Sequence, residues 1–273
     1  MNILDKIIIN KQEEIKRDKE NYPLQFLIDL ITEGLPPTRN FFKCLSSYSN
    51  VSIIAELKFA SPSRGVINKK RKLEEIIRAY TAGGVAAISV LTERKFFQGD
   101  PDNIRKVKKI TNLPVLRKDF IIDEYQIYQS RCFGADAILL LANLLDQSSL
   151  NYFQKIARSL GMDCVVEVHS IDELKKAWGT KSNIIGINNR NLANFSIDFA
   201  ATTKLSHLIP TDCLLISESG IKNREDIKEL SFYGIDAVLI GEALMSADDL
   251  NNKLKELVGV PRRNKKRKQI YVG

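Results

Sequence analysis

Two opposite charges in an apolar segment are the first candidates for a functional site. Glu56 and Lys58 follow the apolar pair Ile53 and Ile54, a run typical of a buried parallel strand. Side chains alternate across a strand, so Ile54, Glu56 and Lys58 share one face. Burying a charge is costly unless the charge is paired or functional. The pattern indicates either a structural ion pair under a loop or, as we favour, a site at the carboxyl end of a strand.

Ionisable and amide side chains recur at the ends of later strand-like segments. Lys118 ends one such segment, Glu167 lies in another, and Asn188 and Arg190 follow a third. Strand ends are often polar, so one residue of this kind means little, but five strands that each supply one predict a site. The candidate residues at strand ends are Glu56, Lys58, Ser61, Lys118, Glu167, Asn188, Arg190, Glu218, Ser219, Gly220, Gly241 and Glu242.

Strand-like and helical segments alternate regularly along the chain. Eight apolar segments are each followed by a helical segment, in units of about thirty residues. We predict strands at 53–59, 85–91, 113–117, 135–141, 163–168, 183–187, 213–216 and 235–240. This repeat predicts an α/β fold, a single closed (β/α)8 TIM barrel. The rival, an open doubly wound sheet, normally has a Gly-rich dinucleotide turn after its first strand, and residues 61–65 (SPSRG) do not form one.

Two late segments indicate a phosphate site in such a barrel. Residues 217–221 (SESGI) and 240–243 (IGEA) each place a glycine between a strand and a helix, where backbone N–H groups are free. Barrels frequently bind phosphate in the loops after strands seven and eight. Two turns that merely need room would have the same sequence, but the repeated pattern favours phosphate.

The predicted organisation has three parts. Residues 1–48 form a helical extension, with helices at 3–19 and 23–31, that covers one end of the barrel. Residues 49–258 form the barrel, with a last helix at 242–257, and residues 259–273 form a basic, disordered tail. The tail holds six Lys and Arg residues and no acid, so removing them from the net charge of +8 leaves +2. We therefore expect a solvated tail rather than a nucleic-acid partner.

The composition excludes several classes of protein. No apolar run reaches membrane-spanning length, and the first residues lack a secretory signal. Four scattered cysteines have neither CxxC nor His pairing of metal spacing. We expect a cytoplasmic protein with no membrane partner, no metal site and no cofactor, acting as a monomer. The cysteines are Cys44, Cys132, Cys164 and Cys213.

Residues 54–65 (IAELKFASPSRG) resemble the signature of the indole-3-glycerol phosphate synthase family of tryptophan biosynthesis. Residues 91–93 (LTE), 96–99 (FFQG), 117–120 (RKDF), 166–168 (VEV), 187–192 (INNRNL) and 217–221 (SESGI) resemble the later motifs of this family in order. The resemblance covers residues 3–258. It implies a barrel enzyme, a carboxy-lyase that closes the ring of 1-(2-carboxyphenylamino)-1-deoxyribulose 5-phosphate with loss of CO2 and water, without a cofactor.

The resemblance also implies a role for each matching residue. Lys118 matches the general acid that protonates the substrate carbonyl, and Glu167 the carboxylate of the dehydration, with Glu56 as a second carboxylate. Lys58 matches the lysine near the substrate carboxylate and phosphate, and Asn188 a residue that positions the anthranilate part. The implied substrate-binding residues are Ser61, Phe97, Phe120, Arg190, Glu218, Ser219, Gly220, Gly241 and Glu242.

One site residue departs from the family pattern, and two other functions remain to be weighed. Glu242 stands where the family often has Ser or Thr, so we expect its charge to point away from the phosphate. A phosphoribosylanthranilate isomerase would share the two late turns, but it would not need the Glu56 strand together with Lys118 and Arg190. An RNA-binding protein with a decayed site would not keep the expected residue type at every catalytic position.

Overall fold

The computed structural model describes residues 2–62, 64–68, 71–190, 197 and 199–263. In these residues, eight parallel strands form a closed barrel, and β1 pairs with β10 to complete it. This confirms the predicted (β/α)8 barrel and excludes the open sheet. The barrel strands are β1 (Ser52–Leu57), β4 (Ala87–Leu91), β5 (Val115–Lys118), β6 (Ala137–Leu141), β7 (Asp163–Val168), β8 (Ile184–Asn188), β9 (Leu214–Glu218) and β10 (Ala237–Ile240).

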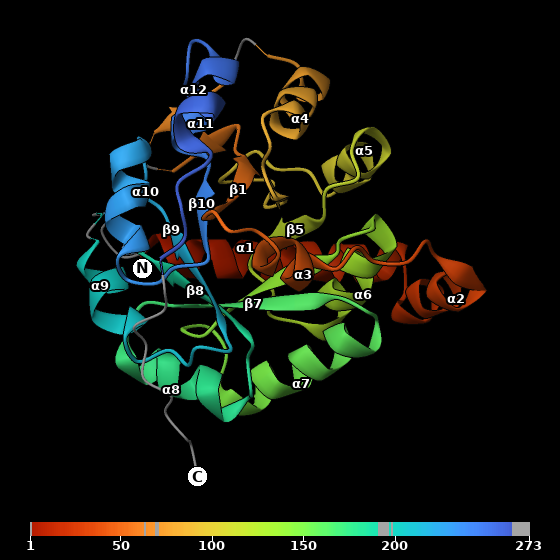
Figure 1. Cartoon of the computed structure of the whole chain (residues 1–273). Helices are drawn as coiled ribbons and strands as arrows, with labels where there is room; N and C mark the ends of the chain where they lie inside the picture. Colours follow the sequence, from red (N-terminus) through yellow and green to blue (C-terminus); the bar gives the residue numbers. More distant parts are fainter. Residues whose placement is uncertain (1, 63, 69–70, 191–196, 198, 264–273) are drawn as a thin grey trace.

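Helices surround the strands (Figure 1). They are α1 (Ile3–Asn21), α2 (Leu24–Gly34), α3 (Phe41–Ser46), α4 (Leu73–Ala82), α5 (Asp102–Ile110), α6 (Glu124–Phe133), α7 (Gln147–Ser159), α8 (Ile171–Gly179), α9 (Ala200–Ser206), α10 (Arg224–Ser231), α11 (Glu242–Met245) and α12 (Leu250–Leu257). A small antiparallel hairpin, β2 (Ala60–Ser61) and β3 (Gly65–Val66), lies in the loop after β1. The predicted single helix at 242–257 is wrong: Asp249 accepts a hydrogen bond from the Asn252 amide and starts α12 as a separate helix.

The alternation of side chains along each strand divides the core into two parts. On β1, Ile54 lies in the cluster inside the barrel, and Ile53, Ala55 and Leu57 lie in the cluster between strands and helices. The inner cluster fills the barrel below the site with residues such as Leu116. Glu56 therefore points inward, as its two-residue spacing from Ile54 predicts.

The N-terminal extension contacts both ends of the barrel, which goes beyond the prediction that it covers one end. At the amino ends of the strands, Ser52 donates a hydrogen bond to the α3 carbonyl of Leu45 at 3.0 Å. At the carboxyl ends, Lys11 of α1 forms an ion pair of 2.9 Å with Asp119, directly after β5. Helix α2 lies outside the barrel against α6 (Figure 1). A short apolar helix was not expected at 41–46, because six residues are too few to show a helical period.

The start of the predicted tail is part of the folded structure. Val260 accepts a hydrogen bond from the Val51 amide, and the Arg262 amide donates to the Ser49 carbonyl at 2.9 Å. The Arg262 guanidinium reaches the carbonyls of Leu45 and Asp236. The folded structure therefore extends past the expected boundary at residue 258 and includes residues 259–263. Arg262 holds this segment in place by pairing with the buried Asp236 carboxylate. Residues 264–273 lie outside the described residues.

Among the described residues, no helix combines the length and the apolar character that crossing a membrane would need. In the same part of the chain, no group of three or more His, Cys, Asp or Glu side chains is arranged to hold a metal ion. All four cysteines are free thiols.

Candidate active site

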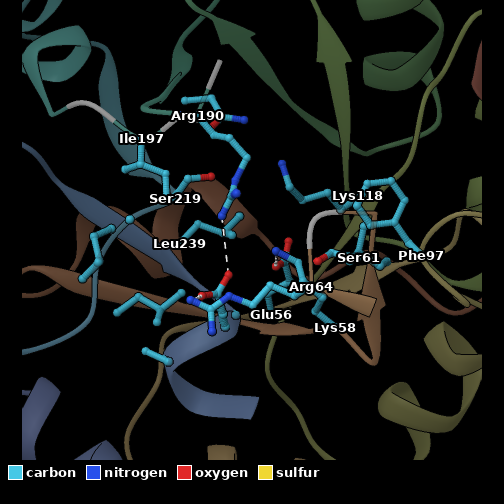
Figure 2. Close-up of a pocket in the computed structure, with 18 of the residues that line it drawn as sticks. Glu56, Lys58, Ser61, Arg64, Phe97, Lys118, Arg190, Ile197, Ser219 and Leu239 are labelled. Atoms are coloured by element: carbon cyan, nitrogen blue, oxygen red, sulfur yellow. Dashed lines mark hydrogen bonds and ion pairs between the residues drawn. The ribbon is translucent and has the colours of Figure 1, made fainter. Parts of the chain in front are cut away.

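The carboxyl ends of the strands open into a cavity of about 390 Å³. Figure 2 shows Lys118, Ser61 and Phe97 on one side of it, and Arg190 and Ser219 on the other. The cavity brings together all of the residues predicted from the sequence except Glu218, which lies beneath it against Lys118. The predicted residues that line it are Glu56, Lys58, Ser61, Phe97, Lys118, Phe120, Glu167, Asn188, Arg190, Ser219, Gly220, Gly241 and Glu242.

Lys118, at the end of β5, lines the cavity and joins two buried carboxylates. Its ammonium donates to Glu167 Oε2 of β7 at 3.0 Å and to Glu218 Oε2 of β9 at 2.7 Å. Asn188, at the end of β8, donates to the other Glu167 oxygen at 3.0 Å. One cation is thus held between two buried carboxylates from different strands, and an amide fixes the orientation of one of them.

Burial and charge act against each other in this cluster. Burial alone would lower the pKa of Lys118, but the carboxylates of Glu167, Glu218 and Glu56 outweigh it and raise the pKa above its ordinary value. Burial raises the pKa of Glu218 to about 7, against the attraction of Lys118. For Glu167, Lys118 and other donors outweigh burial and lower the pKa. Near neutral pH the cluster therefore keeps a proton on Lys118 while Glu218 can gain or lose one.

A second ion pair lies beside this cluster. Lys58, which follows β1, has its ammonium 2.5 Å from Glu56 Oε2. Glu56 is fully buried, and its Oε1 has no hydrogen-bond partner among the described residues. A structural ion pair would satisfy both oxygens, so an unsatisfied buried oxygen that borders a cavity favours the functional interpretation.

One wall of the cavity is apolar and was only partly visible in the sequence. The rings of Phe97 and Phe120 lie 6.2 Å apart between centroids. Glu93 holds the Phe97 backbone in place, because its carboxylate accepts a hydrogen bond from the Phe97 amide at 3.0 Å. Leu139 and Leu239 line the cavity from the barrel interior. Sequence reasoning missed Glu93 as a support and both leucines as lining residues, because nothing in a buried apolar strand marks the residue that borders a cavity.

The turn after β9, where we predict a phosphate site, contains two successive residues with positive φ. Ser219 has φ 68° and Gly220 has φ 87°. Asn189 supports this turn by donating to the carbonyls of Glu218 and Ser219, at 2.9 and 3.2 Å. Basic side chains also line the cavity: Lys222, Lys253, Arg64 and Arg190.

Glu242 differs from the expectation that its charge points away from the ligand. Its side chain lines the cavity and forms ion pairs with Arg64 at 2.8 Å and with Arg190 at 3.5 Å. Two guanidinium groups offset the cost of placing a carboxylate here. The carboxylate therefore lies between two cations that could otherwise face an anionic ligand.

The comparisons with known proteins agree with this geometry. The family model described as indole-3-glycerol phosphate synthase matches residues 4–257. A protein from Acetivibrio thermocellus with that name is 45% identical over 94% of this chain and 100% of its own length. One from Alkaliphilus metalliredigens with the same name is 47% identical over 93% of this chain and 97% of its own length.

Among solved structures, the chain is similar in fold to other barrels. A 3-hexulose-6-phosphate synthase from Salmonella typhimurium matches with a TM-score of 0.61 and 14% identity, over 75% of this chain and 95% of that one. A thiamine phosphate pyrophosphorylase from Pyrococcus furiosus matches with a TM-score of 0.56 and 16% identity, over 77% and 94%. These structures show the fold alone, whereas the family model and the curated relatives extend over nearly the whole sequence. The chain belongs to the indole-3-glycerol phosphate synthase family.

Proposed function

We propose that this chain is a carboxy-lyase that converts 1-(2-carboxyphenylamino)-1-deoxyribulose 5-phosphate into indole-3-glycerol phosphate, CO2 and water. The observation that carries the proposal is the Lys118 ammonium, held between two buried carboxylates at the floor of a partly apolar cavity. Membership of the family and the cations at the cavity edge support it. The substrate carries a phosphate, a carboxylate and an aromatic ring, and the cavity offers a partner for each.

The phosphate and the aromatic ring of the substrate bind at different parts of the cavity. The phosphate binds the turns at Ser219, Gly220 and Gly241, where backbone amides and nearby cations favour an anion. The anthranilate ring packs against Phe97 and Phe120, which exclude water from one side.

Ring closure uses Lys118 as general acid. The ring carbon that bears the carboxylate attacks the ketone, one C–C bond forms, and Lys118 gives its proton to the carbonyl oxygen as negative charge develops there. The C–C bond to the carboxylate then breaks, CO2 leaves, and its electron pair restores the aromatic ring. An alkoxide is a stronger base than an amine, so the raised pKa of Lys118 keeps the proton in place without preventing its transfer.

Dehydration follows from the two carboxylates beside Lys118. The new hydroxyl leaves as water with one proton gained, and the adjacent ring carbon loses one proton to form the indole double bond. Glu167 and Glu56 face the cavity from β7 and β1 and act in these two transfers. Their positions on opposite strands allow acid and base to work on different atoms of one intermediate.

The test is conversion of this substrate by the purified chain, followed by indole fluorescence and by release of CO2. We expect product from the wild type and about 10³-fold less from Lys118→Met. Phosphoribosylanthranilate serves as the alternative substrate. Turnover of that isomerase substrate without formation of indole glycerol phosphate would overturn the proposal.

A further inference from the structure

The proposed reaction consumes one proton in each turnover. Lys118 gives one proton during ring closure, whereas the dehydration both supplies and removes a proton. The carboxylate leaves as neutral CO2, so no group of the substrate returns the proton that Lys118 gave. The amine must be recharged from solvent before the next turnover, while substrate or product fills the cavity above it.

A chain of titratable groups leads from Lys118 to the outer side of the barrel. His169 follows β7, and its Nε2 lies 3.4 Å from Glu167 Oε1, on the carboxylate whose other oxygen accepts from Lys118. On its other edge, His169 Nδ1 lies 3.2 Å from Glu173 Oε2 of α8. The His169 amide also donates to Glu173 at 2.8 Å. The order Glu173, His169, Glu167, Lys118 is therefore continuous.

His169 has no evident structural use for its second nitrogen. Nε2 is buried and has no hydrogen-bond partner of good geometry within the described part of the chain. A buried polar atom left in this state calls for an explanation. Proton transfer to Glu167, whose Oε1 lies 3.4 Å from Nε2, supplies one.

Charges from three elements face the ring. Burial alone would lower the pKa of His169, but Glu173 of α8, with Glu167 of β7 and Glu218 of β9, raises it above its ordinary value. Lys118 lies beyond Glu167 and Glu218. The side chain is 18% exposed and does not line the cavity. Water can therefore recharge an imidazolium here while the cavity is occupied.

We propose that His169, positioned by Glu173, returns to Lys118 through Glu167 the one proton that each turnover consumes. The proposal rests on the proposed function. The Nε2–H bond of the imidazolium breaks as an O–H bond forms on Glu167, and the Nδ1–H tautomer stays bound to Glu173. The Glu167 carboxyl group then rotates so that the proton received on Oε1 faces the neutral Lys118 amine and is transferred to it, and water recharges His169. His169 thus acts through Glu167 as a positioning residue and does not touch the substrate.

The test compares the first turnover with later ones in His169→Gln. Lys118 starts charged, so rapid mixing should give a burst of about one product per enzyme at the wild-type rate. Steady-state kcat should then be at least about tenfold lower, and KM should fall in proportion, because a slow step after the chemistry leaves kcat/KM unchanged. Added imidazole should restore kcat in His169→Ala. The wild-type kcat should fall as pH rises through the His169 pKa, and the variant should lack that limb. His207→Gln changes the other histidine, which is exposed, and should behave as wild type.

Glu173→Gln is the second variant, because it keeps the shape of the side chain and removes its charge. We expect the same burst and a smaller loss of kcat, since Nδ1 keeps an acceptor. Equal slowing of the first and later turnovers in either variant would show that His169 only orients Glu167 and would overturn the relay. Unchanged kcat in His169→Gln would overturn it as well. Failure of the wild type to form product would instead overturn the proposed function.

Discussion

Three consecutive residues, Arg117, Lys118 and Asp119, belong to two clusters of buried charge with different properties. Because side chains alternate along β5, Lys118 points into the barrel and its neighbours point outward. Arg117 donates to Thr92, Asp119 and groups of α6. Asp119 accepts from Thr92 and from its own next amide, and pairs with Lys11. The outward cluster has a partner for each Asp119 oxygen.

The inward cluster also buries charges of both signs but is less completely paired. Glu56 Oε1 and Glu218 Oε1 are buried without a hydrogen-bond partner in the described residues. A buried oxygen without a hydrogen-bond partner costs free energy in a folded protein. Such an oxygen is retained where a ligand or a transferred proton will use it. Burial of charge alone therefore does not mark a site, whereas burial of an unsatisfied charge beside a cavity does.

Loss of the inward cation should have the largest effect. Lys118→Met should lower kcat/KM by about 10³-fold while the barrel remains folded. Without the ammonium, the folded-state pKa of Glu167 and Glu218 should rise, so the folded state holds protons that the unfolded state releases. The variant should therefore lose stability as pH rises from about 4 through 7 and above. Thermal unfolding at several pH values measures this, with the exposed Lys109→Met as control. Equal pH dependence in both variants would contradict the charge argument.

A substitution in the outward cluster should lower the stability of the fold rather than the activity. Asp119→Asn removes the counter-charge of Lys11 and Arg117, and we expect the free energy of unfolding to fall by about 3 kcal/mol. Activity per folded molecule should change only slightly.

The pH dependence of this effect has a definite sign. Burial alone would raise the pKa of Asp119, but Lys11, Arg117 and the Thr92 hydroxyl hold it far below its ordinary value. Its contribution is thus complete above about pH 4 and is lost as pH falls below that. Urea unfolding at pH 7 and pH 3 should show wild type and Asp119→Asn converging in acid. A constant difference at both pH values would show that packing, not charge, is responsible.

Gly241 allows the inward cluster to take its shape. A Cβ at this position would lie 2.2 Å from Glu56 Oε2. The sequence argument explains this glycine by the close approach of the backbone to a phosphate. Its φ of −116° is also allowed for alanine, so the contact with Glu56, not the backbone conformation, is what requires glycine here. Gly241→Ala should lower kcat by about tenfold by displacing Glu56. In a Glu56→Ala background the same substitution should cost nothing further. An additive loss in the double variant would place the effect in phosphate binding instead.

Removing the charge of Glu242 should have a smaller effect, and it should strengthen ligand binding instead of weakening function. We expect its carboxylate to compete with a ligand anion for Arg64 and Arg190, and its side chain is 26% exposed, so solvent screens the pair. Glu242→Gln should bind inorganic phosphate and substrate about two- to fivefold more tightly, most clearly at low salt. Titration calorimetry with phosphate measures this, and Glu74→Gln on the exposed face of α4 is the control. Weaker binding would mean that Glu242 instead orients the two arginines.

Much of this arrangement could be predicted because strand periodicity is a local signal. The alternation from Ile54 to Glu56 predicted an inward carboxylate, and the eight apolar segments predicted the strands within a few residues. Contacts between distant segments leave no such signal. Nothing near Lys11 indicates that it reaches Asp119, and nothing near His169 indicates that it faces Glu167. The same holds for Glu242, whose environment depends on Arg64 and Arg190 from two other loops.

The smallest effect should come from the last ten residues. Residues 264–273 hold Lys265, Lys266, Arg267 and Lys268, which repel one another, and little apolar surface to offset the entropy of ordering. Deleting them should leave the melting temperature and kcat/KM unchanged at low and moderate salt.

Deleting residues 261–273 instead is the matched comparison. It also removes Arg262, which reaches the Leu45 and Asp236 carbonyls and pairs with the Asp236 carboxylate at 3.2 Å. We expect this longer deletion to lower the free energy of unfolding by about 1–3 kcal/mol, with kcat/KM of the folded enzyme unchanged. These contacts lie at the amino end of the barrel, and the Debye length of about 8 Å at physiological salt is shorter than the barrel is deep. A salt-sensitive loss of kcat/KM in the shorter deletion would show that the basic residues act at the cavity, and that the two ends of the barrel are not independent.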